Sequence, residues 1–166
     1  MKTKLTILFF ALMATMSYAQ HPQSGENSNI SLVSFKDAAF NDAYNKYIEL
    51  KNSLVASKAE DAQHSASALQ KVLTNIAGAS NAAASAEKIA KSSDLKLQRL
   101  SFSDLSNEIA ALAKKNKLTS GSIYLEYCPM ANNNSGAVWL SNEKSIMNPY
   151  FGNAMLHCGS VTETIQ

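Results

Sequence analysis

The sequence predicts a mainly α-helical protein, an up-down four-helix bundle with a small C-terminal β-hairpin or irregular element. Three observations lead to this prediction. Apolar residues recur at steps of three and four along residues 40–112. Alanine is abundant among them, which lets helices approach closely. After Gly121 the pattern changes to an alternation with a period of two, which is typical of strands.

The first two helices are predicted within residues 35–57 and 58–78. One face of the first is apolar: Phe40, Ala43, Tyr47, Leu50 and Leu54. The second has a similar stripe: Ala59, Ala62, Ala66, Leu69, Leu73 and Ile76. Gly78 is expected to stop the second helix, because glycine adopts the left-handed conformation found after helix ends. His64 lies off the stripe, so we expect a solvated surface histidine.

The third and fourth helices are predicted over residues 80–92 and after Asp94. The third is short, and Asp94 stands where a side chain caps the start of the fourth. The fourth has an apolar stripe: Leu95, Phe102, Leu105, Ile109 and Leu112. Its end is crowded with cations that suit the helix dipole: Lys114, Lys115 and Lys117.

A β element is predicted after the helices. Residues 123–128 alternate, with Ile123, Leu125 and Tyr127 expected on one side of a strand. Residues 130–136 are turn-forming because Asn and Gly tolerate left-handed conformations. Residues 137–141 are expected to return as the second strand of a hairpin, and residues 148–153 form another turn.

The N-terminus has the pattern of a secretory signal peptide. Lys2 and Lys4 precede an apolar run too short to span a bilayer comfortably, and cleavage is expected after Ala19. Residues 20–33 form a flexible lead-in, and residues 34–162 form one domain with a Cys/Met-rich motif at 123–160. After cleavage, 13 basic side chains balance 13 acidic ones, which argues against a nucleic-acid partner. No later segment is expected to enter a membrane.

All sulfur between Gln20 and the C-terminus lies in the last forty or so residues of the chain. These residues and one neighbouring histidine are soft or borderline metal ligands: Cys128, Met130, Met147, Met155, His157 and Cys158. Thiolate and thioether donors together favour Cu(I) over hard cations. Cys128 and Met130 are expected to share a strand face. Met155 and Cys158 would close the site from the other side, with Trp139 as a flanking aromatic shield.

A structural explanation of the same residues stays open. Cys128 and Cys158 can form a disulfide in an exported chain, stabilising a loop of this size by roughly 3–4 kcal/mol. Met147 and Met155 are equally suited to fill gaps between the β element and the helices. Trp139, Tyr150 and Phe151 are typical packing residues. Catalysis is not expected, because the chain offers no convincing triad, CxxC pair or zinc-hydrolase ligand set.

The C-terminal segment resembles a known family signature. "YCPMANNNSGAVWLS" followed by "NPYFG", "ML" and "CG" is similar to the end of DUF3347-type proteins, a family of small exported bacterial proteins. The helical half carries a matching "D…QR..F..LS" pattern from Asp94 to Ser106. The resemblance covers about residues 35–162. It extends to a C-terminal domain of CusB-type adaptors of heavy-metal efflux pumps.

The resemblance implies copper or silver handling in the periplasm. The motif positions Cys128, Met130, Met155 and Cys158 are the implied ligands, whereas Met147 and His157 fall outside the signature. The protein is expected to buffer Cu(I) or deliver it to an efflux adaptor or another periplasmic metal protein, and no cofactor is needed for folding. The alternative is a protein-interaction module with a Cys128–Cys158 disulfide, in which exposed faces of Trp139, Tyr150 and Phe151 form the docking surface.

Overall fold

The computed structural model describes residues 32–166. The predicted signal peptide, residues 1–19, and all but the last two residues of the predicted lead-in lie outside this range. Four main helices follow one another along the chain: α1 (Ala38–Val55), α2 (Ala59–Leu73), α3 (Ser80–Ala90) and α4 (Leu95–Lys115). The strands are β1 (Ser34–Phe35), β2 (Leu118–Ser120), β3 (Ile123–Cys128), β4 (Ala137–Ser141) and β5 (Ser160–Ile165). Two short helical segments complete the fold: α5 (Ala131–Asn134) and the 3₁₀ turn η1 (Gly152–Ala154).

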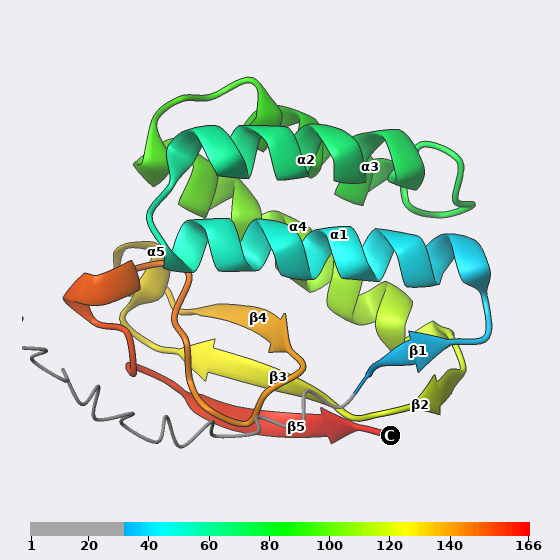
Figure 1. The fold of residues 1–166 in the computed structure, drawn as a ribbon. Coiled ribbons are helices and arrows are strands. Elements are labelled where there is room, and N and C mark those ends of the chain that lie inside the picture. The colour runs from blue at the N-terminus through cyan, green and yellow to red at the C-terminus, as the bar shows by residue number, and fades with distance from the viewer. Residues whose placement is uncertain (1–31) are drawn as a thin grey trace, which may run out of the picture.

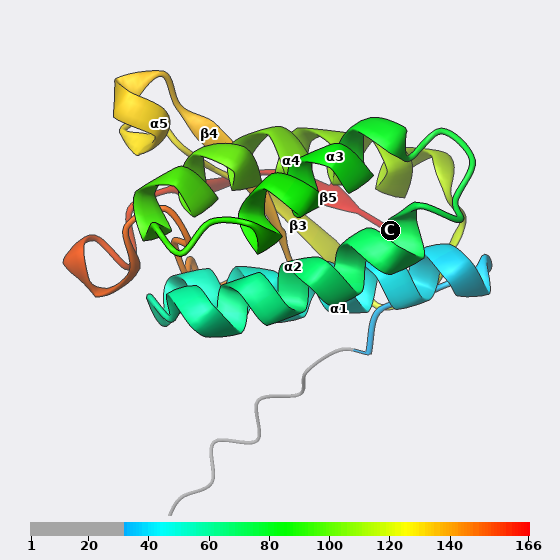
Figure 2. The same ribbon diagram turned by 90° about the horizontal axis from the view of Figure 1, so that it is seen from above.

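The helices and strands are arranged in layers. Each helix packs against the next one in the chain, from α1 to α4. Figures 1 and 2 show α2 and α3 on the outside, with α1 and α4 between them and the β-sheet. The prediction of a mainly helical fold with small C-terminal strands is therefore confirmed. The four-helix up-down bundle is not confirmed, because α1 and α4 make few direct contacts and α4 packs on β4 instead.

The predicted apolar stripes form the core. The α1 stripe from Phe40 to Leu54 is buried, and so are Phe102, Leu105 and Ile109 of α4. Asp94 is the N-cap of α4, since its carboxylate accepts hydrogen bonds from the backbone N–H groups of Lys96 and Leu97. His64 is exposed, as expected.

The predicted stop of α2 at Gly78 is wrong. The helix ends at Leu73, where the Thr74 hydroxyl donates to the Gln70 carbonyl at 2.7 Å. The Asn75 amide donates to the Lys71 carbonyl at 3.0 Å. These side chains satisfy carbonyls at the end of the helix, so the chain leaves the helix before it reaches glycine. Gly78 lies in the following loop with a φ of +79°.

The predicted hairpin is confirmed, and it is part of a larger sheet. β3 pairs antiparallel with β4 in the register Glu126↔Trp139, and the order of the sheet is β4-β3-β5. The turn between β3 and β4 is left-handed, as the asparagines predict: Asn132, Asn133 and Asn134 have φ of 53°, 56° and 64°. Strand β5 and the small β1–β2 ribbon were not predicted. Most β5 side chains are exposed Ser, Thr and Glu residues, so the apolar pattern of that strand is weak.

A row of aromatic rings joins the helical layer to the sheet. The Tyr47 and Phe102 rings stack at 5.3 Å, Phe102 contacts Tyr150 at 5.8 Å, and Tyr150 meets Trp139 edge-on at 5.9 Å. The Tyr47 hydroxyl accepts a hydrogen bond from the Leu140 backbone N–H of β4 at 3.0 Å. It also lies 2.8 Å from the Ser106 hydroxyl of α4. One buried hydroxyl therefore connects α1, α4 and β4.

No helix within residues 32–166 combines the length and apolar character that a membrane crossing requires.

Replacing Tyr47 with phenylalanine should lower the free energy of unfolding by about 1–3 kcal/mol, because the buried Leu140 N–H and Ser106 hydroxyl lose their partner. Urea denaturation followed by circular dichroism measures the change. Tyr124→Phe is the matched control: Tyr124 is only half-buried, so water can replace a lost partner, and the change should stay below about 0.5 kcal/mol. Equal effects of the two substitutions would contradict the role given to Tyr47.

Candidate functional site

The two cysteines meet at one end of the β-sheet. Cys128 is the last residue of β3 and is fully buried, whereas Cys158 lies just before β5 and is half-buried. Because β3 and β5 pair antiparallel in the register Tyr127↔Ser160, residues 30 positions apart arrive side by side. The two Sγ atoms lie 2.7 Å apart, and both are free thiols. The hydrogen bond with Cys128 raises the pKa of the Cys158 thiol, so Cys158 is protonated at neutral pH.

Asn148 holds the segment that brings Cys158 to this position. Its side chain is fully buried, and its Nδ2 donates to the Cys158 carbonyl at 2.7 Å. Its Oδ1 accepts hydrogen bonds from the backbone N–H groups of Tyr150 and Phe151 at 2.8 and 3.3 Å. The "NPYFG" stretch therefore forms the predicted turn, and its hydrogen bonds also hold the backbone of Cys158 in place.

Gly159 allows the close approach of this segment to the sheet. Its φ is +140°, and a Cβ at this position would lie 2.9 Å from Cη2 of Trp139. A larger residue would push the Cys158 segment away from Trp139. The indole of Trp139 is fully buried beneath the segment. Trp139 therefore lies beside the cysteine pair, but it cannot present an exposed docking face, and that part of the interaction-module prediction is wrong.

The methionines divide into two places. Met155 shares a tight turn with Cys158, since the Cys158 N–H donates to the Met155 carbonyl at 3.1 Å. Met147 is half-buried and adjoins Asn148 in the same loop. Met130 lies elsewhere: β3 ends at Cys128, so Met130 does not share a strand face with it as predicted. Its side chain is 46% exposed and lines a cavity against α4 that includes neither cysteine.

His157 has a fixed ring orientation. Its Nδ1 lies 2.9 Å from the Ile146 carbonyl. Because a carbonyl only accepts hydrogen bonds, Nδ1 carries the proton and the neutral ring keeps its lone pair on Nε2. This is the tautomer that a histidine needs to bind a metal through Nε2. The residue is exposed and precedes Cys158 directly.

His, Cys, Asp and Glu side chains do not by themselves form a metal site in the described part of the chain. Within residues 32–166, no three side chains among His, Cys, Asp and Glu gather where they could hold one ion. A metal at the cysteine pair would therefore use both thiolates together with a thioether. That donor set is soft and suits a cation of low coordination number such as Cu(I).

Glu126 is a buried acid that sequence reasoning missed. It lies two residues before Cys128 on β3, opposite Trp139, and neither carboxylate oxygen has a hydrogen-bond partner within residues 32–166. Burial raises its pKa to about 8, against the opposing effects of the Lys51 charge and the nearby Trp139 indole N–H. Burial likewise lowers the pKa of Lys51 on α1. The only signal in the sequence is the position of this carboxylate, which the alternation places on the same strand face as Tyr124 and Cys128.

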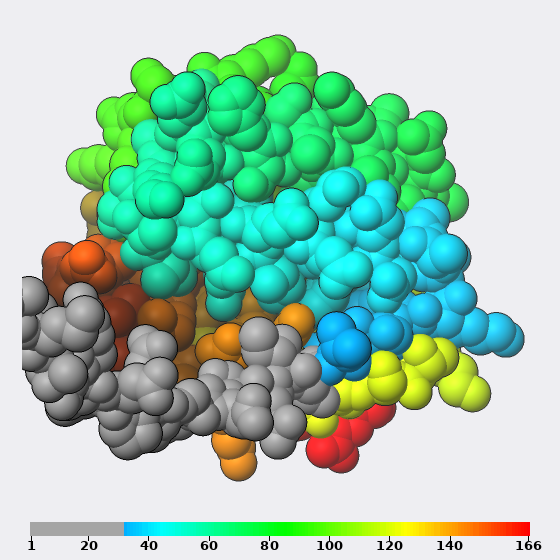
Figure 3. Space-filling model, viewed as in Figure 1, coloured from blue at the N-terminus to red at the C-terminus, as the bar shows by residue number. Residues whose placement is uncertain are grey.

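The burial of this face has a visible cause. The segment that follows β4 crosses the sheet and returns to β5 through η1 (Figure 1). In Figure 3 the orange-red part of that segment lies at the surface against the teal end of α1, in agreement with the contacts between α1 and η1. Glu126 lies near Lys51 of α1 and near Glu143 of this segment, so α1 and residues 142–159 together bury a polar strand face that alternation alone would leave in water.

Replacing Asn148 with alanine should lower the free energy of unfolding of the reduced protein by roughly 2–4 kcal/mol, because three backbone groups lose a buried partner. Chemical denaturation measures this change, and alkylation of Cys158 by iodoacetamide should become faster. Asn153→Ala in η1 is the control: Asn153 is exposed, so both quantities should remain near those of the native protein. Unchanged alkylation in the Asn148 variant would show that Asn148 does not hold Cys158.

Glu126 should make stability depend on pH. Its folded pKa of about 8 exceeds the ordinary value of 4.5, so the folded state binds the proton more tightly. This contribution is fully present below pH 4.5 and is lost as the pH rises through 8, at up to about 1.4 kcal/mol per pH unit between them. Glu126→Gln should remove this slope and be more stable than the native protein at pH 8. Glu49→Gln, at an exposed position of α1, should leave the slope unchanged.

Comparisons with known proteins agree with this description of the chain. Residues 43–121, from within α1 to just beyond β2, match the model of a family described as "Protein of unknown function (DUF3347)". No curated protein and no solved structure matches the chain. The Cys/Met motif lies after the matched span, and the likeness to CusB-type adaptors is not part of the match. The match over residues 43–121 therefore supports the resemblance of the chain to the DUF3347-type family.

Proposed function

We propose that this protein binds a soft cation, with Cu(I) as the best match, through the thiolates of Cys128 and Cys158. The observation that carries the proposal is the meeting of the only two cysteines of the chain at the β3–β5 end of the sheet. Met155 is the proposed thioether ligand, because it occupies the same turn as Cys158. His157 would have to move toward the pair to donate its Nε2, because its ring does not gather with the two cysteines in this structure. Met130 would have to leave the α4 cavity to take part.

Metal binding requires the two sulfur atoms to separate. A metal–sulfur bond of about 2.3 Å places two thiolates of a tetrahedral site about 3.8 Å apart, whereas these Sγ atoms are 2.7 Å apart. Rotation about χ1 of one cysteine supplies such a movement without a change in the backbone. Cys158 is the better candidate for this rotation, since it is half-buried and Cys128 is enclosed. Loss of both thiol protons on binding makes the affinity rise with pH.

The proposed role is buffering or transfer of the ion, by ligand exchange alone. A site with one accessible thiolate and a thioether leaves room for a partner's ligand to attack, which favours transfer. The resemblance of the C-terminal motif supports a periplasmic location after signal-peptide cleavage, and a heavy-metal efflux adaptor or another periplasmic metal protein as partner. Helices α1 to α4, which we propose to be an up-down bundle, serve as the scaffold for the site.

One observation favours the alternative function. A separation of 2.7 Å between two thiols is closer to a disulfide bond, at about 2.05 Å, than to a metal-bridged pair. In that case the oxidised pair holds residues 142–159 against the sheet, and the protein is an interaction module. Three aromatic residues were predicted to form its docking surface. Trp139 and Tyr150 are buried, so of these three only Phe151 can contribute to that surface.

Anaerobic titration of the reduced protein with Cu(I), in competition with a chromophoric chelator, tests the metal function. The native protein should retain one copper ion, and Cys128→Ser or Cys158→Ser should abolish retention. Met155→Leu should weaken binding about tenfold, equivalent to about 1.4 kcal/mol. Met130→Leu is the matched control, because it removes a thioether outside the cysteine turn, and it should leave the affinity unchanged.

The mass of the protein purified without reductant separates the two functions. A mass two hydrogens below the reduced value, together with no copper uptake after reduction, would reject the metal function and leave the disulfide-pinned module. Equal losses of Cu(I) affinity in the Met155→Leu and Met130→Leu variants would show that Met130 is also a ligand. Copper retained by both cysteine variants would exclude the cysteine pair as the site.

A further inference from the structure

A cavity on the other side of the β3–β4 turn collects the exposed apolar residues of the fold. It has a volume of about 630 Å³ and lies between the first turns of α4, the α5 turn and the "NPYFG" loop. Four large apolar side chains are strongly exposed within residues 32–166, and three of them line this cavity: Leu97 at 53%, Leu100 at 48% and Met130 at 46%. Cavities of this size and character hold small ligands in other proteins.

The charges around the cavity have one sign. Lys96 and Arg99 line it, and no carboxylate does. The Arg99 guanidinium donates to the carbonyls of Pro149 and Leu54 and to the Ser57 hydroxyl, all of them neutral groups. Within residues 32–166, neither cation forms an ion pair. Burial lowers the pKa of Arg99, so a ligand anion would compensate a partly desolvated charge.

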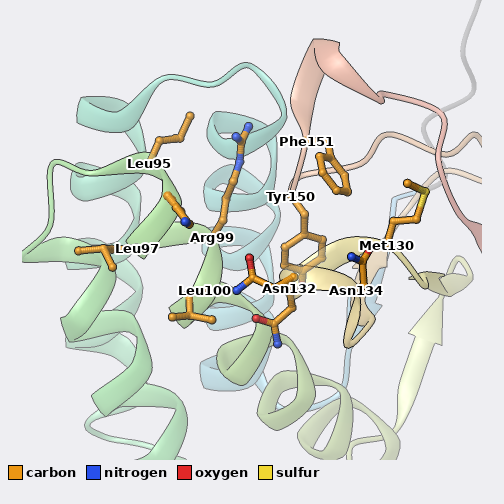
Figure 4. A pocket seen from close by; sticks show the side chains of 11 residues that line it. Leu95, Leu97, Arg99, Leu100, Met130, Asn132, Asn134, Tyr150 and Phe151 are labelled. Carbon is orange, nitrogen blue, oxygen red and sulfur yellow. The ribbon is translucent and has the colours of Figure 1, made fainter.

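The opposite wall is polar and held in an unusual conformation. Figure 4 shows the side chains of Asn132 and Asn134 across the cavity from Leu95 and Leu97. Both residues have a left-handed backbone, and so does Asn133 between them. Three consecutive left-handed residues carry conformational strain that the surrounding structure must hold in place. Their side-chain amides lie at the rim, where they can donate hydrogen bonds to a ligand oxygen.

We propose that this cavity binds a small apolar carboxylate, with its hydrocarbon part on Leu97, Leu100 and Met130. The carboxylate group lies toward Lys96 and Arg99, and the amides of the left-handed turn donate to it. Charge complementarity selects this occupant over two others. The apolar N-terminal stretch of the chain carries Lys2 and Lys4, and a cation is disfavoured beside Lys96 and Arg99. A second copy of the chain would bring the same two cations against the first pair.

Decanoate is the probe, compared with decanol and decyltrimethylammonium, all below their micelle concentrations. Isothermal titration calorimetry of the protein should show one decanoate site, with affinity at least tenfold above that for either control. Amide resonances of residues 96–100 and 130–134 should shift on binding. Lys96→Glu should weaken decanoate binding at least fivefold. Lys115→Glu, the same charge reversal at the exposed far end of α4, should change it less than twofold.

Four outcomes would overturn the proposal. Equal binding of decanol and decanoate would reduce the cavity to an apolar patch without a role for the cations. Equal effects of the two lysine reversals would mean that only net charge matters. Resonance shifts confined to other residues would place the ligand elsewhere. Concentration-dependent dimerisation that decanoate does not reverse would assign the face to a second copy. Because neither cysteine lines the cavity, each result is independent of the metal function.

Discussion

The fold depends on the buried hydroxyl of Tyr47 and the row of aromatic rings that runs from Tyr47 to the sheet. A three-stranded sheet of this size has too little apolar surface to be stable alone, so it must be attached to the helices. The Tyr47 hydroxyl provides the polar part of that attachment, since it satisfies the Leu140 N–H and the Ser106 hydroxyl. The rings from Phe102 to Trp139 provide the apolar part and carry the contact across the sheet.

The segment between β4 and β5 turns this attached sheet into a site. It covers the strand face that carries Glu126 and Cys128, and Asn148 holds it there through hydrogen bonds to the backbone. The covering has a cost, because the carboxylate of Glu126 is enclosed with no hydrogen-bond partner in the described part of the chain, and its pKa rises to about 8. The same covering brings Cys158 to Cys128. The arrangement that disfavours the ionised form of Glu126 therefore also brings the two thiols together.

The protein has two candidate ligand-binding sites, and the β3–β4 turn separates them. On one side the cysteine pair, with Met155 and His157 in the adjoining turn, offers soft donors. On the other side the α4 cavity offers apolar walls, two cations that form no ion pair within residues 32–166, and asparagine amides. Met130 belongs to the second place despite its position two residues after Cys128, because β3 ends at Cys128 and Met130 belongs to the turn that follows. The two proposed ligands, a soft cation and an apolar anion, therefore involve different residues.

Local patterns in the sequence were enough to determine the helices, the Asp94 cap, the β3–β4 hairpin and its left-handed asparagine turn. Each of these depends on residues within a few positions of one another, through periodicity, capping or backbone preference. The sequence also identified the two cysteines as candidate functional residues. Only the tertiary structure decided that they touch, that Glu126 and Trp139 are buried, and that Met130 lies apart. The meeting of the cysteines and the burial of Glu126 and Trp139 follow from the packing of α1 and residues 142–159 against the sheet, which alternation along one strand does not encode. Met130 lies apart because β3 ends at Cys128.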